Sequence, residues 1–252
     1  MSATAAALAV PVGAVAGLGA GWLSVVLERI ERLEAEDRED REAHTREVEA
    51  ATHMAREAGS APPAEQPWPE DRYGWTAIER VLCPILGAIG FAAFAAHQAI
   101  GSGLLIDLLW VTMFVQIFGF DLKHRLILNR VTYPGVVAAL ALSFVTPGLT
   151  FVHALVGGAV IGVFFLLMNV MTRGGIGLGD AKLGVLIGAT CGITLDVDHL
   201  GAVYAVIYGI FLGGLVALVL LLLRLRSLKD PIPYGPFLCV GAAVRYLNIP
   251  RF

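Results

Sequence analysis

Charged residues are scarce in this chain, and that scarcity decides its class. Of its 252 residues only 15% are charged, whereas 57% are hydrophobic. The mean hydropathy of +0.73 lies well outside the balance of a soluble domain. A chain of this composition is expected to be an integral membrane protein.

Basic surfaces, cysteine pairs and metal-binding spacings are lacking as well. The net charge of −3 provides no basic face for a nucleic acid. The three cysteines, Cys83, Cys191 and Cys239, stand far apart in apolar sequence and form neither a disulfide framework nor a CxxC metal site. The six histidines show no HExxH or comparable spacing. The sequence therefore predicts no nucleic-acid partner, no metal and no cofactor.

Long apolar stretches are what the chain has in abundance. A membrane-spanning helix needs about 20 mostly apolar residues. Seven stretches fit well, and an eighth, short and interrupted by Pro and Gly, fits weakly. In chain order they are roughly 5–27, 77–97, 101–120, 131–147, 152–171, 181–195, 200–223 and 233–248. The expected fold is an all-α integral membrane protein, a polytopic bundle of about eight transmembrane helices in a lipid bilayer.

The basic residues predict how this bundle is oriented. With the N-terminus outside, every one of the 18 Lys and Arg residues except Arg245 and Arg251 falls in a segment expected inside. Three units follow: a first span at 1–27 that we expect to remain uncleaved, a charged cytoplasmic loop at 28–76, and a polytopic core at 77–252. Within the loop, acid-first pairs four residues apart predict a solvated helix over 28–58 that extends the first span. A Pro-rich linker follows at 59–71.

Acidic residues are few outside the loop, and three of them need an explanation. Fifteen of the 21 acids lie between Glu28 and Glu79, where we interpret them as solvated, and three others fall in connecting loops. Asp107, Asp121 and Asp180 remain, at or inside spans, where an ionised carboxylate costs ~2.5–3.5 kcal/mol at the helix centre. Asp107 lies near the outer end of its span, where a polar partner or a water-filled crevice is the preferred interpretation. The other two suggest function.

Asp121 and Asp180 are expected to meet. Asp121 ends the third span and Asp180 begins the sixth, both at the cytoplasmic side, so both carboxylates lie at one depth. Two close carboxylates cannot both ionise cheaply and share a proton, so that one can deprotonate water while the other polarises a peptide carbonyl. Helix dipoles favour Asp180 as the ionised base and Asp121 as its protonated partner. The pair predicts peptide hydrolysis without a metal or a nucleophilic side chain.

Glycines crowd the approach to Asp180. Gly174, Gly175, Gly177 and Gly179 permit positive φ and leave the backbone bare, so that a substrate backbone can come close. A simple helix-breaking turn is the alternative. A phosphate cradle is not indicated, because no GK[ST] or GxGxxG follows a strand here.

Three motifs, in order, resemble the type IV prepilin peptidases, membrane aspartyl proteases with a GxGD motif. Residues 177–182, GLGDAK, look like the family's GxGDxK. Residues 121–134 are similar to its D-L-x-x-R-x-I-P-N-x-x-T-x-P, with Leu128 in place of the usual Pro. Residues 231–238, PIPYGPFL, are similar to its IPFGPFL. The resemblance covers roughly residues 72–245. A weaker echo of the family's N-terminal motif lies at 17–29, with Ser24 near the position of a missing Asn.

The resemblance implies an aspartic endopeptidase of the bacterial cytoplasmic (inner) membrane. Its substrate would be a prepilin or pseudopilin, of a type IV pilus or type II secretion system, with a short basic leader cut after a glycine just before an apolar helix. Asp121 and Asp180 would be catalytic, and 77–252 would be the peptidase core. The residues expected to bind substrate or shape the site are Gly177, Gly179, Lys182, Asn129, Pro233, Gly235 and Pro236.

Several alternatives stay open beside this interpretation. Lys182, two positions from Asp180, has the wrong spacing to face it on a helix, so it is either a membrane anchor or a substrate contact. The prolines of 231–236 either break a helix or also shape the site. Many relatives in the resembled family methylate the new N-terminus and carry a zinc-bound cysteine tetrad in the loop. Residues 28–76 contain no cysteine, so zinc is not expected and methyl transfer stays open.

Two rival functions use the same residues. A proton-coupled transporter also needs membrane carboxylates and Gly/Pro-interrupted spans, but it predicts inverted repeats that the sequence does not display. A non-catalytic assembly protein built on a dead protease would have lost an aspartate, and both are present. The sequence does not indicate an oligomeric state.

Overall fold

A computed structural model describes residues 3–31, 33–57, 73–173, 175–193, 200–223 and 233–248. All regular structure in these residues is helical, which confirms the all-α class. The helices are α1 (Ala3–Ile30), α2 (Leu33–Glu57), a π-helical turn η1 (Ile78–Leu82), α3 (Cys83–His97), α4 (Ser102–His124), α5 (Asn129–Leu142), α6 (Phe151–Met171), α7 (Leu178–Cys191), α8 (Gly201–Leu222) and α9 (Gly235–Asn248).

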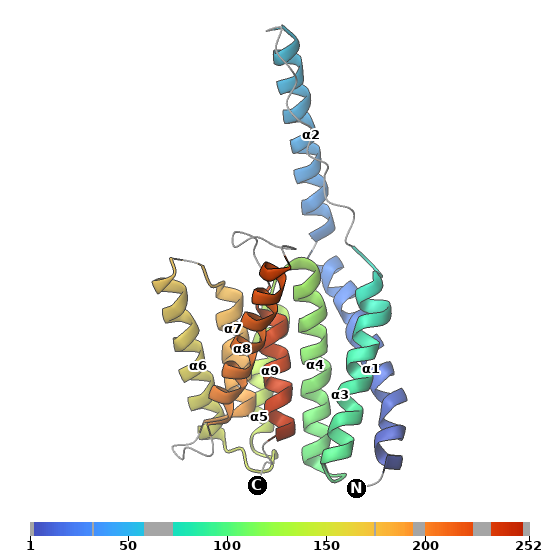
Figure 1. Ribbon diagram of the computed structural model, residues 1–252, viewed down its shortest axis with the longest axis vertical. Helices are drawn as coiled ribbons and strands as arrows, with labels where there is room; N and C mark the ends of the chain where they lie inside the picture. The colour runs from blue at the N-terminus through green and yellow to red at the C-terminus, as the bar shows by residue number, and fades with distance from the viewer. Residues whose placement is uncertain are drawn as a thin grey trace.

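The helices other than α2 form one bundle in which the chain runs alternately up and down (Figure 1). Both termini lie at one end of this bundle, and α2 projects from the opposite end. The C-terminal end of α4 and the N-terminal ends of α7 and α9 all lie at the end that carries α2. This arrangement brings the three motifs of the sequence to one end of the molecule.

Each of the eight expected apolar stretches is helical, but the helices differ in length. Five are long and apolar enough to cross a membrane: Ala5–Ile30, Ile78–His97, Ser102–His124, Phe151–Met171 and Gly201–Leu222. The chain is thus a polytopic membrane protein. Helices α5, α7 and α9 have 14 residues each, or about 21 Å of helix, less than the ~30 Å of a hydrocarbon core. Of these, α7 lies deepest, with Leu183, Leu186 and Ile187 fully buried.

Glycines let three pairs of helices approach closely. A Cβ atom on Gly87 of α3 would lie 2.2 Å from a backbone oxygen of α1, and one on Gly188 of α7 would lie 2.2 Å from a backbone oxygen of α6. On α9, a Cβ at Gly241 would lie 2.3 Å from the Ala205 oxygen of α8. Small residues at such contacts are the usual means of helix association in a membrane. The α6–α7 contact is the one that fixes the helix carrying Asp180.

The charged loop differs from the expectation at its start. Instead of one helix that extends the first span, α1 ends at Ile30 and α2 begins at Leu33. The exposed pair Glu42–Arg46 forms as predicted, with 3.8 Å between Glu42 Oε2 and Arg46 Nη2. The predicted solvation of Glu28 is wrong, because this side chain is only 4% exposed. The Pro-rich linker at 59–71 lies outside the described residues.

Candidate active site

Asp121 and Asp180 line a single cleft of about 320 Å³. Asp121 comes from the last turns of α4 and is 4% exposed, and Asp180 comes from the first turn of α7. The two carboxyl groups are close enough to repel one another electrostatically. The pair expected from the sequence is therefore brought together, between two helices that run in opposite directions.

The first residue of α9 presses against Asp121. A Cβ atom on Gly235 would lie only 2.5 Å from Asp121 Oδ2, so the close approach requires a glycine. This Oδ2 is buried and has no hydrogen-bond partner among the described residues. The first N–H groups of a helix have no partner within the helix and favour negative charge nearby. Each aspartate therefore lies beside a helix N-terminus, Asp180 in that of α7 and Asp121 against that of α9.

The glycines before Asp180 act through their small size. None of Gly175, Gly177 and Gly179 has a positive φ, so the freedom that the sequence suggested is not used there; Gly174 lies outside the described residues. A Cβ on Gly179 would lie 3.3 Å from Ile127 Cβ, and one on Gly177 would lie 3.5 Å from Asp180 Oδ2. Their bare backbone lets the start of α7 pack on the Asp121 motif and leaves the cleft open.

Lys182 links the two aspartate motifs. Its Nζ donates a hydrogen bond of 2.7 Å to Asn129 Oδ1 and lies 5.8 Å from the centre of the Tyr133 ring. Lys182 also lines the cleft, whereas Asn129 only holds the lysine. The predicted site residue Asn129 thus acts through Lys182 in this arrangement.

The segment before α9 supplies one wall of the cleft. Pro233 lines it, as expected, but Pro236 is buried in the first turn of α9 and does not. Sequence reasoning missed five lining residues: Arg125, Leu126, Ile127, Gly175 and Tyr234. Arg125 and Ile127 stand in the motif around Asp121, and that motif was the signal that could have found them.

Leu128 occupies the position where the resembled family has proline. Its φ of −76° and ψ of 131° are angles that a proline adopts without strain. The side chain is buried against Leu27 and Phe120. The connection between α4 and α5 therefore keeps a proline-like backbone, and packing holds it in place of the ring.

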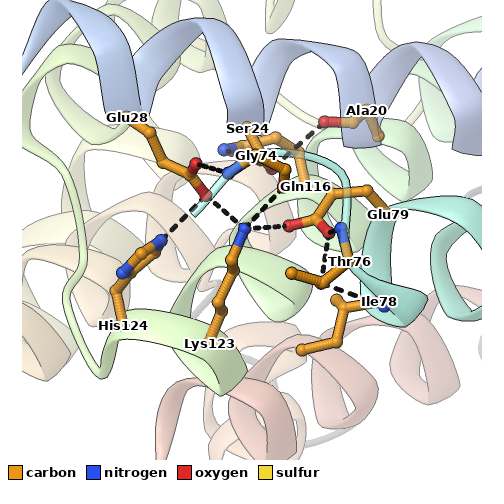
Figure 2. A network of polar contacts seen from close by, with 10 residues as sticks. All are labelled: Ala20, Ser24, Glu28, Gly74, Thr76, Ile78, Glu79, Gln116, Lys123 and His124. Carbon is orange, nitrogen blue, oxygen red and sulfur yellow. Dashed lines mark hydrogen bonds and ion pairs between the residues drawn. The ribbon is translucent and has the colours of Figure 1, made fainter. Parts of the chain in front are cut away.

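A buried ionic cluster lies next to the cleft, on the side of α1 (Figure 2). Lys123, two residues after Asp121, points between the carboxylates of Glu28 and Glu79. Its Nζ donates to Glu28 Oε1 at 2.6 Å, to Glu79 Oε1 at 2.8 Å and to the Gly74 oxygen at 2.8 Å. The ammonium group thereby uses all three of its donors.

Both carboxylates of the cluster have further partners. Glu28 Oε2 accepts from the Gly74 N–H at 2.8 Å, and Glu28 Oε1 lies 2.9 Å from His124 Nε2. Glu79 Oε2 accepts from the N–H of Thr76 at 2.7 Å and from its hydroxyl, in the manner of a capping box at the start of η1. The cluster joins α1, the return of the charged loop and the catalytic end of α4. Ser24, higher on α1, accepts a 3.5 Å hydrogen bond from Gln116 of α4.

Asp107 has the polar partner that the sequence predicted. Gln98 Nε2 donates to Asp107 Oδ2 at 2.9 Å, and the carboxyl group is buried in α4. In the part of the chain that the structure describes, no three His, Cys, Asp or Glu side chains gather as metal ligands. The chemistry that these side chains offer in the cleft is therefore that of two carboxylates.

The fold and the site together define a polytopic helical membrane protein with a carboxylate pair in one cleft. The type IV leader peptidase family matches the chain over residues 108–222, which include Asp121 and Asp180. The leader peptidase HopD of Escherichia coli is 30% identical to the chain over 145 residues, which make up 54% of the chain and 88% of HopD. The chain belongs to the type IV leader peptidase family.

Longer relatives are similar over part of their length. The prepilin leader peptidase/N-methyltransferase of Bacillus subtilis (strain 168) is 24% identical over 157 residues, and that of Aeromonas hydrophila is 28% identical over 176 residues. These matches cover 62% and 66% of the chain, and 61% and 57% of the two relatives. The chain thus spans about three-fifths of the length of these relatives. No solved structure matches the chain significantly.

Proposed function

We propose that this protein is an intramembrane aspartyl endopeptidase that removes the leader from prepilins or pseudopilins. The observation that carries the proposal is the meeting of Asp121 and Asp180 in one cleft at one end of the bundle. Family membership supports the same activity, because the printed names of the relatives are those of leader peptidases.

The two carboxyl groups divide the chemistry of hydrolysis. The ionised aspartate takes a proton from a water molecule, whose oxygen attacks the carbonyl carbon of the scissile peptide bond. The protonated aspartate donates a hydrogen bond, and then its proton, to the carbonyl oxygen, so that a neutral tetrahedral diol forms. Collapse of this diol breaks the C–N bond, with one proton passed to the departing amine. The pair ends with one shared proton, as it began.

The cleft suits an extended backbone that carries a small residue at the cut. The bare glycines of 175–179 leave room beside Asp180, and Arg125 and Lys182 make the cleft rim basic. The end of the bundle that carries the cleft is proposed to face the cytoplasm, at the inner membrane. There a leader in the cytoplasm and an apolar helix in the bilayer would meet the dyad at their junction.

The proposal is confined to proteolysis. The names of the longer relatives include an N-methyltransferase activity. The loop of this chain, residues 28–76, contains no cysteine, so the tetrad that the resemblance associates with methyl transfer has no counterpart there. No cofactor is needed for the hydrolytic steps above.

Replacement of either aspartate by asparagine tests the proposal. Asparagine keeps the shape of the side chain but cannot cycle a proton, so Asp121→Asn and Asp180→Asn should each lower the cleavage rate by at least about 10²- to 10⁴-fold. Cleavage is scored as a mobility shift of a co-expressed prepilin-like protein encoded near this chain. Asp107→Asn is the matched control, a buried aspartate of α4 far from the cleft, and should keep most activity. Near wild-type cleavage by either dyad variant would refute the mechanism and favour a proton-coupled transporter.

A further inference from the structure

An apolar groove of about 530 Å³ runs along α7 on the outside of the bundle. Helices α5 and α6 both pack against α7 and contact each other little, so they form the walls of the groove and α7 forms its floor. Lys182 is its only charged lining residue; all others are apolar. Such a groove offers nothing to a polar ligand or a lipid headgroup along most of its length.

The groove leads into the cleft. Lys182 lines both, and its hydrogen bond to Asn129 holds it at the junction. On α7 the groove extends from Leu178, beside the dyad, to Ala189, which is about 16 Å of helix at 1.5 Å per residue. Three turns of an apolar helix would fit along it, with one end at the catalytic carboxylates.

One wall presents a continuous stripe for such a helix. Leu155, Ala159, Val163 and Leu166 recur at intervals of three and four residues along α6 and line the groove. These side chains are exposed, Leu155 and Val163 by 50% and 54%. Ala159, the smallest of the four, leaves room for a close approach at the middle of the stripe, as small residues do at helix contacts in membranes.

We propose that this groove is the docking site for the apolar helix that follows the scissile bond of the substrate. The inference rests on the proposed leader peptidase function and adds to it the surface that aligns the substrate. A helix seated over α7 continues directly into the cleft, so its N-terminal end places the leader junction at Asp121 and Asp180. The groove thereby selects substrates by an apolar helix of about three turns next to the cut.

Filling the groove tests the proposal. Ala159→Trp places an indole in the middle of the groove, whereas Val160→Trp places it on the adjacent, lipid-facing side of α6, outside the groove, where Val160 is 46% exposed. Cleavage of the prepilin-like protein by the Ala159→Trp variant should fall at least about tenfold, and cleavage by the Val160→Trp variant should stay at the wild-type rate. Equal rates for both variants would overturn the docking site while the peptidase function stands. A wild-type protein that cleaves nothing would instead refute the proposed function.

Crosslinking provides the second measurement. A photoreactive residue at Leu155 or Leu166, in the inactive Asp180→Asn background, should form an adduct with the apolar helix of the bound prepilin-like protein. The same residue at Val160 should not. Adducts with lipid alone at Leu155 and Leu166 would show that acyl chains occupy the groove, and this result would overturn the proposal even if the Ala159→Trp variant cleaved poorly.

Discussion

Removal of Lys123 would leave Glu28 and Glu79 as buried carboxylates without their shared cation. Breaking a buried ionic group in this way costs about 3–5 kcal/mol, because the remaining charges stay desolvated. We expect Lys123→Met to lower the free energy of unfolding by this order, measured as unfolding in detergent. Loss of the clamp two residues from Asp121 should also lower the cleavage rate.

Arg130 provides the matched control for this change. Its Nε lies 2.6 Å from Glu31 Oε1, but the Arg130 side chain is 61% exposed. An exposed pair contributes only about 0–1 kcal/mol, so Arg130→Met should leave the stability nearly unchanged. Equal stability losses in the two variants would contradict the assignment of Lys123 as the buried clamp.

The residues that the sequence identified and those that it missed differ in their surroundings. An acid in an apolar span stands out, so Asp121 and Asp180 could be identified without a structure. Glu28 and Glu79 mark the two ends of a run of solvated acids, and composition alone assigns them to that run. Their burial comes from contacts with Lys123, 95 and 44 residues away in the chain. Only the packing of α1 and η1 on α4 could reveal it.

At the scale of elements, the start of α9 determines the wall behind Asp121. Because a Cβ on Gly235 would lie 2.5 Å from Asp121 Oδ2 and 3.0 Å from its Cγ, Gly235→Ala must displace either the carboxyl group or α9. A displacement of about 1 Å at a catalytic group can cost ~10²-fold in rate. We expect Gly235→Ala to lower cleavage to that extent, measured with the same prepilin-like substrate.

The control is Gly214→Ala in α8, where an added Cβ has nothing within 4 Å. Both variants should keep the wild-type helix content and resist unfolding nearly as well as the wild type. Full activity in Gly235→Ala would mean that α9 does not confine Asp121. A loss of folded protein in Gly235→Ala alone would assign Gly235 to the fold rather than to the site.

The elements themselves were predictable to different degrees. Long apolar stretches such as 200–223 correspond to helices within a few residues, because burial in lipid demands a regular helix. The break between α1 and α2 carries no proline or glycine, so local sequence gave no warning of it. The groove over α7 depends on how α5, α6 and α7 pack, and no local pattern encodes that arrangement.

At the scale of the whole molecule, alternation of the chain decides whether the dyad can exist. The third and sixth expected spans run in opposite directions, and the structure brings the end of α4 and the start of α7 to the same end of the bundle as α2 (Figure 1). The basic residues predict that this end is cytoplasmic. The leader of a prepilin must reach the dyad from that side, so the proposed function requires this orientation.

Cysteine labelling in intact cells tests the orientation. Arg125 and Arg173, both exposed, lie at the proposed cytoplasmic end, and Ile100, 84% exposed, lies in the connection at the opposite end. Arg125→Cys and Arg173→Cys should resist a membrane-impermeant thiol reagent until the cells are opened, whereas Ile100→Cys should react at once. The native background should be low, because Cys83 and Cys239 are buried and Cys191 is half-buried. Labelling of Arg125→Cys and Arg173→Cys from opposite sides would separate the carboxylates and defeat the dyad. Labelling of both from outside would keep the dyad but place it out of reach of a cytoplasmic leader, which would refute the proposed substrate.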